Sequence, residues 1–371
     1  MKRELYSFYG NKLSRSLKLT RMNLKQLILT ISLFPLSLIQ AGDVFEINDR
    51  SFTGTLSGGV GDTLFDQLET ELNSGELDLD QTDFVRGMGG ANILAGKGQG
   101  TDYANHFDLF LISASTGFGI DTGDNEFDEL DEGVPGGISI LPNIAIGLPG
   151  ALFKLDKTDF FFNFTSGDIT SVLEGSLSED LVISGEASGF GFHIRHQLMP
   201  KVDVVPFGVL RWGGVFIHAG IVKSELDLEM TLELDDETVT DDDADATASF
   251  TNAEATLGAI SNTQSIPIEV STYVQLMYIM TFYTGFGIDF NSGYAESTAE
   301  IEGDINATAT GGTGSGTAEI EVGDKENVES SNTRSFVGFQ FNLPLLKVFA
   351  EVNKKSGKNA VGLNFGLKAT W

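Results

Sequence analysis

Four histidines are the first residues of this chain that suggest chemistry, because imidazole is a common metal ligand and general base. They are His106, His193, His196 and His218. His193 and His196 lie three residues apart in an alternating stretch, and on a strand this spacing directs the two rings to opposite faces. The pair therefore cannot chelate one metal ion. His193 and Arg195 share a parity, so we expect both to line a polar interior.

Clustered carboxylates are the second candidate, because hard cations such as Ca²⁺ prefer carboxylate oxygens. The run 121–132 carries seven acidic residues, and the run 225–245 carries eleven, concentrated at 235–245. Neither run has the Gly and Glu spacing of an EF-hand loop, so solvated acidic loops are favoured over divalent cation sites. The sequence also lacks a nucleophile elbow, a phosphate-binding loop and an HExxH motif. We predict that the protein is not an enzyme and binds no cofactor.

The composition limits the class of partner. Among 371 residues, 53 are Asp or Glu and only 23 are Lys or Arg, which gives a formal net charge of −30. This balance argues against nucleic acid, because phosphate binding needs clustered cations, and it is compatible with divalent cations or basic proteins. The absence of cysteine excludes disulfide bonds and thiolate metal sites.

Residues 1–41 have the features of a secretory signal peptide. A basic region precedes the apolar run 27–39, LILTISLFPLSLI, and a small residue follows at Ala41. The apolar run is too short for an ordinary membrane-spanning helix. Translation begins at Met1 or at Met22, and the second start gives the better-proportioned signal. An anchor helix that is never cleaved is the alternative.

The segment 42–105 carries helical rather than alternating patterns. Apolar residues recur at helical spacing in 62–73, with Asp62 or Thr63 as the N-cap, and again in 82–95. Helices of this length are marginal alone, so they need a surface to pack against. We expect this segment to be periplasmic or to plug a lumen, since the glycine-rich second helix is narrow enough to enter one.

From residue 106 to 371, apolar residues alternate with polar ones at a period of two, which predicts strands. The clearest example is SELDLEMTLEL at 224–234. Ten segments follow this rule, at about 107–121, 136–148, 159–166, 182–197, 210–234, 247–275, 281–302, 317–343, 345–353 and 360–371. The run 298–324 also reads as an extended hairpin with GGTGSG at its tip.

The connections between these segments alternate in character. Those after the second, fourth, sixth and eighth segments are short or apolar. Those after the first, third, fifth and seventh are polar or acidic, and KKSGKN at 354–359 forms a last short loop. Outer-membrane barrels show this asymmetry, with short periplasmic turns and long external loops. We therefore predict an all-β fold, an antiparallel transmembrane β-barrel of about ten strands (range 8–14), with both chain ends on the periplasmic side. A soluble exported β-sandwich is the alternative.

Aromatic residues near the ends of the predicted strands are expected at the membrane interfaces. They are Phe118, Trp212, Tyr273, Tyr283 and Trp371.

The last segment, AVGLNFGLKATW, resembles the β-signal that the barrel assembly machinery reads in Gram-negative outer-membrane proteins. Its apolar parity contains Leu363, Phe365, Leu367 and the terminal Trp371, a position where Phe is more usual. The opposite parity contains Asn364 and Lys368, which we expect to line the lumen.

Three glycine-rich stretches resemble a family of leptospiral surface adhesins with predicted outer-membrane barrels. They are VRGMGGANILAGKGQGTDYA at 85–104, VVPFGVLRWGGVFIHAG at 204–220 and IEVSTYVQLMYIMTFYTGFGIDFNSG at 268–293. The resemblance implies exposure at the cell surface and, for some members, binding of host matrix or plasma proteins. It assigns no binding residue.

These patterns favour a non-enzymatic barrel in the bacterial outer membrane, in contact with membrane lipid, with its acidic loops at the cell surface. Two functions are compatible with that fold. One is an adhesin-type protein that binds extracellular proteins, or divalent cations, through the acidic loops. The other is a narrow channel for small solutes, in which an acidic lumen and mouth would favour cations.

Overall fold

The computed structural model describes residues 46–57, 60–72, 82–99, 101–104, 107, 109–123, 136–170, 181–206, 209–233, 237–241 and 246–371. The predicted signal peptide at 1–41, His106 and most of the acidic run 121–132 lie outside these residues.

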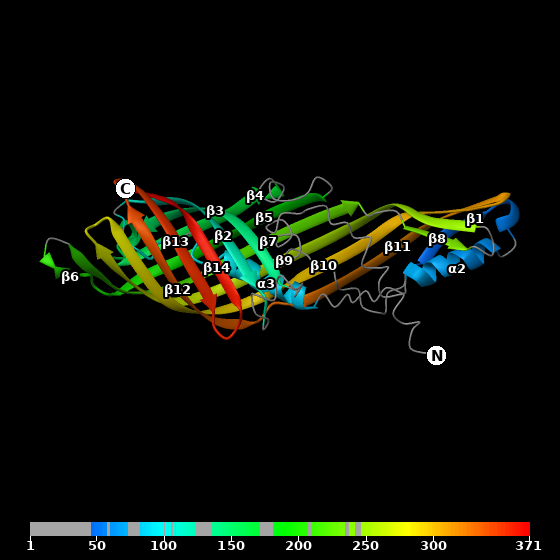
Figure 1. The fold of residues 1–371 in the computed structure, drawn as a ribbon. Helices are drawn as coiled ribbons and strands as arrows, with labels where there is room; N and C mark the ends of the chain where they lie inside the picture. The colour runs from blue at the N-terminus through cyan, green and yellow to red at the C-terminus, as the bar shows by residue number, and fades with distance from the viewer. Residues whose placement is uncertain are drawn as a thin grey trace, which may run out of the picture.

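Ten antiparallel strands form a closed ring (Figure 1). They are β2 (Leu111–Asp121), β3 (Gly137–Pro149), β4 (Thr158–Asp168), β5 (Leu181–Met199), β7 (Leu210–Glu233), β9 (Ala246–Leu276), β10 (Met280–Ala309), β12 (Ser331–Asn342), β13 (Leu346–Lys355) and β14 (Ala360–Thr370). The last strand, β14, pairs with the first, β2, along its whole length, so the ring satisfies its own backbone groups. The predicted ten-stranded barrel is confirmed. A β-sandwich is contradicted, because one sheet closes on itself.

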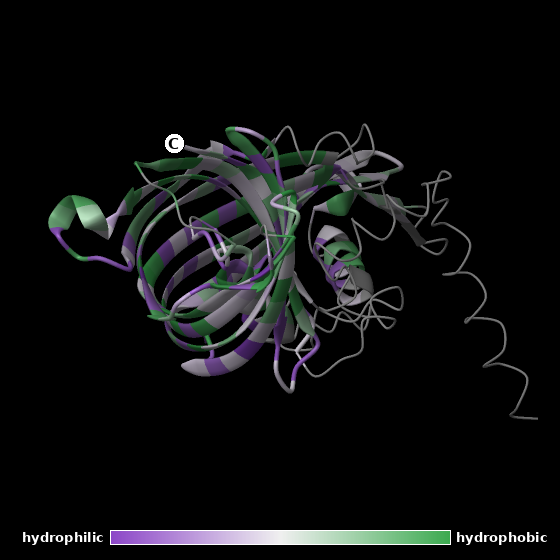
Figure 2. Cartoon of the chain, turned by 90° about the vertical axis from the view of Figure 1, so that its left-hand side faces the viewer, coloured by the Kyte–Doolittle hydropathy of each residue, from purple (hydrophilic) through white to green (hydrophobic). Residues whose placement is uncertain are grey.

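Alternation along the strands separates a lipid-facing surface from an interior. On β10, Phe282, Phe286 and Phe290 are about half exposed on the outer face, whereas Tyr283 and Asp289 are buried inside. The segment 280–290 rises roughly 3.3 Å per residue, and at a strand tilt of about 40° it covers a height of roughly 25 Å. This is the height of the apolar band on the outer surface of outer-membrane barrels. Figure 2 shows green and purple positions alternating around the wall.

The two ends of the barrel differ. At one end the connections are tight, such as 277–279 between β9 and β10 and 343–345 between β12 and β13. Trp371 lies at this short-turn end, where its ring stacks on Phe110 with the ring centroids 4.4 Å apart. At the other end most connections are longer, such as 122–136 between β2 and β3 and 169–180 between β4 and β5, whereas 356–359 between β13 and β14 is short.

Three strands of the ring continue beyond the long-connection end and form a projecting sheet (Figure 1). β7, β9 and β10 are joined there by β8 (Glu237–Asp241), β11 (Gly312–Asn327) and β1 (Glu46–Phe52). We call this part, together with η2 (Gly54–Leu56) and α2 (Val60–Leu72), the extension.

One face of the extension is apolar and is covered by α2. Leu64, Phe65 and Leu68 of this amphipathic helix are buried in a cluster with Phe250 of β9 and Ile305 of β10. The strand β1 pairs with β11, so the N-terminal residues also cover an edge of the sheet.

The helix α3 (Thr82–Ala95) lies inside the ring. It contacts β2, β3 and β14 on one side and β9 and β10 on the other, which places it within the lumen. The chain enters from the extension, runs through the barrel, and reaches β2 at the short-turn end. No helix in the described part of the chain has the length and apolar content to cross a membrane.

Four expectations about the elements were wrong. The first helix begins at Val60, so neither Asp62 nor Thr63 is its N-cap. The segment predicted as one strand at 317–343 is two, since β11 leaves the ring to pair with β1 and only β12 belongs to the wall. β2 begins at Leu111, four residues later than expected.

The fourth error concerns the N-terminal side. We expected both chain ends at the same side of the barrel. The described residues Glu46–Leu72 instead pack on the extension, at the opposite end from Trp371 (Figure 1). The physical reason is the path of α3, which carries the chain through the lumen from one mouth to the other.

Two aromatic residues also depart from expectation. Tyr273 and Tyr283 are almost fully buried and pack inside the ring with Tyr103, Phe216 and Phe336. They follow the inward parity of their strands, so their position near a strand end does not bring them to the lipid.

Candidate functional site

Inside the lumen, α3 packs against glycines of the barrel wall. A Cβ atom at Gly117 or Gly119 of β2 would collide with the backbone of Ala95 or Ala91 of α3. At Gly137 of β3, it would collide with Met88 in the same way. The helix therefore lies directly on the backbone of the wall.

The helix also brings its own glycines to this contact. A Cβ at Gly87 would meet the backbone of Asp121 and Gly137, and one at Gly90 would meet the carboxylate of Asp121. Small residues on both partners thus allow one close contact, which explains why a helix tolerates the segment RGMGGA at 86–91.

Towards the long-connection end, apolar side chains fill the space between helix and wall. Phe84, Val85 and Met88 of α3 are buried with residues of β3, β5, β7 and β9. The wall contributes Leu141, Ile183, Leu226, Leu228 and Met230, among others.

Further along the lumen, charged side chains replace the apolar ones. Arg334 of β12 is fully buried and donates to Asp289 of β10 at 3.0 Å, to Asn353 and to Glu269 of β9. Lys97, which follows α3, lies 3.1 Å from the other oxygen of Asp289. One buried arginine and one lysine from the lumen segment thus neutralise two buried carboxylates of the wall.

A second charged group fixes residues 101–104. Arg195 of β5 donates to Asp159 of β4 at 2.6 Å and to the backbone carbonyl of Asp102. Lys368 of β14 lies 3.5 Å from the Asp102 carboxylate and donates to the carbonyl of Thr101. Strands from separate parts of the ring therefore hold the same short segment.

Tyr103 connects the two charged groups. Its hydroxyl donates to Glu269 at 2.7 Å, and its ring contacts His218, Tyr283 and Phe336. The lumen is filled by these contacts from the apolar zone to the short-turn end.

The residues expected to line the lumen lie inside the ring. His193, Arg195, Asn364 and Lys368 are all less than 10 % exposed, and Asn364 donates to the carbonyl of Lys97. His196 is exposed on the other face, where its ring nitrogen lies 3.0 Å from the Thr158 hydroxyl.

The structure places the four residues of the β-signal pattern on the outer face of β14 or just beyond its end. Leu363, Phe365, Leu367 and Trp371 are each about half exposed. Phe365 stacks on Phe118 of β2 across the closing seam, with the ring centroids 5.6 Å apart.

Sequence reasoning missed Arg334, Asp289, Glu269 and Lys97. The inward parity of β9, β10 and β12 was available as a signal for the first three. Lys97 lies in a glycine-rich stretch after the helix and carries no such signal, because only the tertiary structure brings it into the lumen.

The extension presents a second candidate site, on the face opposite α2. Glu233 of β7 pairs with Glu254 of β9, Glu254 pairs with Glu302 of β10, and Glu302 pairs with Glu319 of β11. All four side chains are exposed, and paired side chains lie on the same face of a sheet. We call these four residues the glutamate row.

A second line of acids lies beside the glutamate row. Glu300 pairs with Glu321, two residues further along each strand and therefore on the same face of the sheet. Partial burial and the neighbouring carboxylates of Glu302, Glu321 and Glu319 raise the pKa of Glu300. The like charges therefore oppose one another, and a sheet gains nothing in stability from them.

The acids do not form an evident metal centre. In the described ranges, no three His, Cys, Asp or Glu side chains are grouped closely enough to hold a metal ion. The glutamate row is spread across four strands as a charged surface rather than folded around one point.

A closed antiparallel ring with an apolar outer band is the architecture of outer-membrane β-barrel proteins, which places this chain in the bacterial outer membrane. The chain belongs to the Lsa36-like family, whose model matches residues 55–371. No curated protein sequence matches the chain.

Solved structures of outer-membrane proteins are similar to this chain at low sequence identity and low TM-score. The translocator domain of the autotransporter NalP from Neisseria meningitidis is 10 % identical, with 72 % of this chain and 90 % of that chain covered and a TM-score of 0.30. Omp33 of Acinetobacter baumannii is 9 % identical, with 74 % and 100 % covered and a TM-score of 0.24. Ail, the attachment invasion locus protein of Yersinia pestis, is 10 % identical, with 71 % and 98 % covered and a TM-score of 0.21.

Proposed function

We propose that this protein is a non-enzymatic, adhesin-type surface protein whose filled barrel anchors the extension outside the cell. The glutamate row is the observation that carries the proposal. Four carboxylates in directly paired positions repel one another, so their arrangement is better suited to contact with a partner than to stability of the sheet. A basic surface of an extracellular protein has the complementary charge.

The difference in connection length between the two ends of the barrel supports the placement of the extension outside the cell. External loops of outer-membrane barrels are the long ones, and the extension continues from the long-connection end. Beyond Phe290, β10 continues for nineteen residues to Ala309, which at roughly 3.3 Å per residue carries the sheet well clear of a membrane surface.

The filled lumen favours anchoring over conduction. A narrow cation channel requires a continuous water path, and α3 with Lys97, Asp102 and Tyr103 occupies the interior. The side chains of Lys97, Asp102 and Tyr103 are each at most 2 % exposed.

We expect the row to dominate binding to basic proteins. The variant Glu254→Gln/Glu302→Gln/Glu319→Gln should bind immobilised plasma or matrix proteins at least 10-fold more weakly, about 1.4 kcal/mol. Wild-type binding should weaken as salt rises, because exposed charges are screened. Surface plasmon resonance with detergent-solubilised protein and a panel of such proteins measures both effects.

A matched control removes the same charge from the same face outside the row. Glu225, Glu229 and Asp304 oppose no acid directly, because their paired residues on both sides are uncharged: Ser188, Asn262, Ser184, Gly258, Thr251 and Thr317. Glu225→Gln/Glu229→Gln/Asp304→Asn should lose less than half as much binding energy. Equal losses in the two variants would indicate a general charge effect, and no binding by the wild type to any of these proteins would contradict the proposal.

A further inference from the structure

The short-turn end carries an unusual connection between β3 and β4. Its sequence is GALFKLDK at 150–157, and Gly150–Phe153 form the 3-10 helix η4. The amide of Leu155 donates to the carbonyl of Gly150 at 2.9 Å, and Lys154 adopts a left-handed conformation with φ of 64°. We call Gly150–Lys157 the rim turn; its backbone is held in place at both ends.

The rim turn exposes apolar side chains. Leu152 is 58 % exposed, Phe153 57 % and Leu155 49 %, all within four residues. Water-soluble turns are built from polar residues, and grouped exposed apolar side chains mark a surface that contacts something less polar than water.

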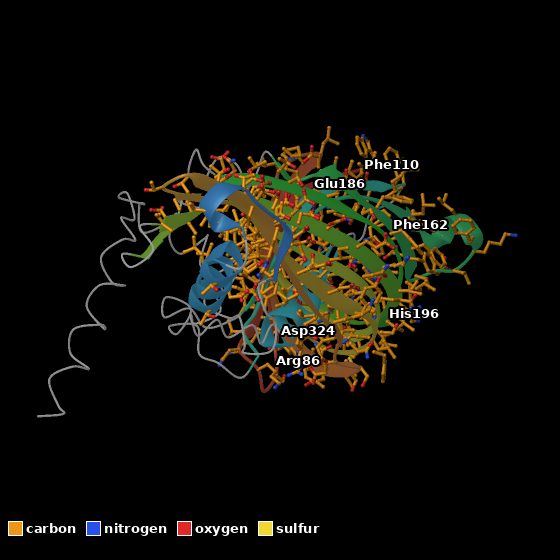
Figure 3. The ribbon with its side chains drawn as sticks, turned by 90° about the vertical axis from the view of Figure 1, so that its right-hand side faces the viewer. Arg86, Phe110, Phe162, Glu186, His196 and Asp324 are labelled. Atoms are coloured by element: carbon orange, nitrogen blue, oxygen red, sulfur yellow. The ribbon has the colours of Figure 1, made fainter. Side chains whose placement is uncertain are left out.

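The apolar surface of the rim turn is continuous with the lipid-facing band. The ring of Phe153 packs edge-on against Phe160 of β4, with the ring centroids 5.7 Å apart, and Phe160 stacks on Phe192 of β5. In Figure 2 the turn is the short coil that projects sideways from the wall, and in Figure 3 it lies beside the labelled Phe162. A sideways direction in a view along the barrel corresponds to the plane of the membrane.

Two cations flank these apolar residues. Lys154 lies between Phe153 and Leu155, Lys157 follows, and both side chains are exposed. Long lysine side chains can lie along an apolar surface while their ammonium groups reach phosphates at the membrane interface. The pattern of large apolar residues with interspersed lysines is typical of segments that lie in the interface.

We propose that the rim turn is a membrane-interface anchor that inserts beside the barrel into the phospholipid leaflet at the short-turn end. Leu152, Phe153 and Leu155 occupy the boundary of headgroups and acyl chains, and Lys154 and Lys157 bind phospholipid phosphates. The anchor fixes the depth of the barrel on one side of its circumference. It follows from the barrel fold and is independent of the adhesin function.

Site-directed spin labelling tests the insertion directly, because the natural chain has no cysteine. A nitroxide at Leu152→Cys in the full chain, reconstituted in phosphatidylcholine–phosphatidylglycerol vesicles, should collide readily with oxygen and poorly with a water-soluble nickel chelate. Ile144→Cys on the outer face of β3 supplies the lipid reference, and Thr298→Cys on the extension supplies the water reference. The ratio of the collision rate with oxygen to the collision rate with the nickel chelate should be at least 5-fold higher at Leu152→Cys than at Thr298→Cys.

Two results would overturn the anchor. A ratio at Leu152 equal to that at Thr298 would show a turn in water, and low collision with both reagents would show a turn covered by protein. The role of the lysines has its own readout. Lys154→Glu/Lys157→Glu should raise nickel access at Leu152 at least 2-fold, and unchanged access would contradict binding of phosphate by the two lysines.

Discussion

Deleting residues 82–104 is expected to open a conducting path through the barrel. The deletion removes α3, Lys97, Asp102 and Tyr103 from the lumen, where the helix contacts strands on both sides of the ring. An α-helix with its side chains is about 10–12 Å wide, so its removal opens a path of that order. Planar bilayer recordings should show stable openings for the deletion variant and essentially none for the wild type.

Point variants at the wall glycines that contact α3 separate displacement of the helix from loss of the barrel fold. Gly119→Val places a branched side chain where the backbone of Ala91 lies, so it should displace α3 and produce intermittent openings. Ala114→Val, on the outer face of the same strand, should remain silent. Large conductance in the wild type would contradict the filled lumen, as would a silent deletion variant that still shows the heat-modifiable gel migration of a folded barrel.

The second large effect concerns the buried charges. Arg334→Met should lower the free energy of unfolding by about 3–5 kcal/mol, because it leaves Glu269 and Asp289 buried with Lys97 as the remaining cation beside Asp289. Urea unfolding in detergent micelles, followed by tryptophan fluorescence, measures this loss.

Lys325→Met is the control for that measurement. Lys325 forms an exposed ion pair with Glu296, with its nitrogen 2.7 Å from the carboxylate. An exposed pair contributes at most about 1 kcal/mol, so this variant should unfold close to the wild type. Similar losses in the two variants would show that the Arg334 network is hydrated and contributes no more than a surface pair.

The wall of the barrel was predictable because alternation is a local property. In each strand of the ring, alternating residues identify the inward and the outward face, as at 224–234. Ten such segments predicted the correct number of strands in the barrel. The boundary between β11 and β12 was not predictable in this way. The break at 328–330 contains neither glycine nor proline, and the two strands differ only in their distant partners, β1 for one and β13 for the other.

The candidate sites depend on tertiary structure to a greater degree. Parity directed attention to His193, Arg195, Asn364 and Lys368, but it named no partner for them in the lumen. The glutamate row depends on the register of four strands, and no single stretch of sequence contains it. The path of the chain through the barrel likewise follows from where α3 packs.

Cysteine labelling in intact cells tests most directly whether the barrel presents the extension to the outside. Single cysteines at Thr298 on the extension and at Lys201 in the connection between β5 and β7 at the short-turn end are both exposed positions. A membrane-impermeant maleimide should label Thr298→Cys in intact cells and Lys201→Cys only after the outer membrane is permeabilised. Labelling of Lys201→Cys in intact cells, with Thr298→Cys protected until permeabilisation, would contradict the proposed orientation.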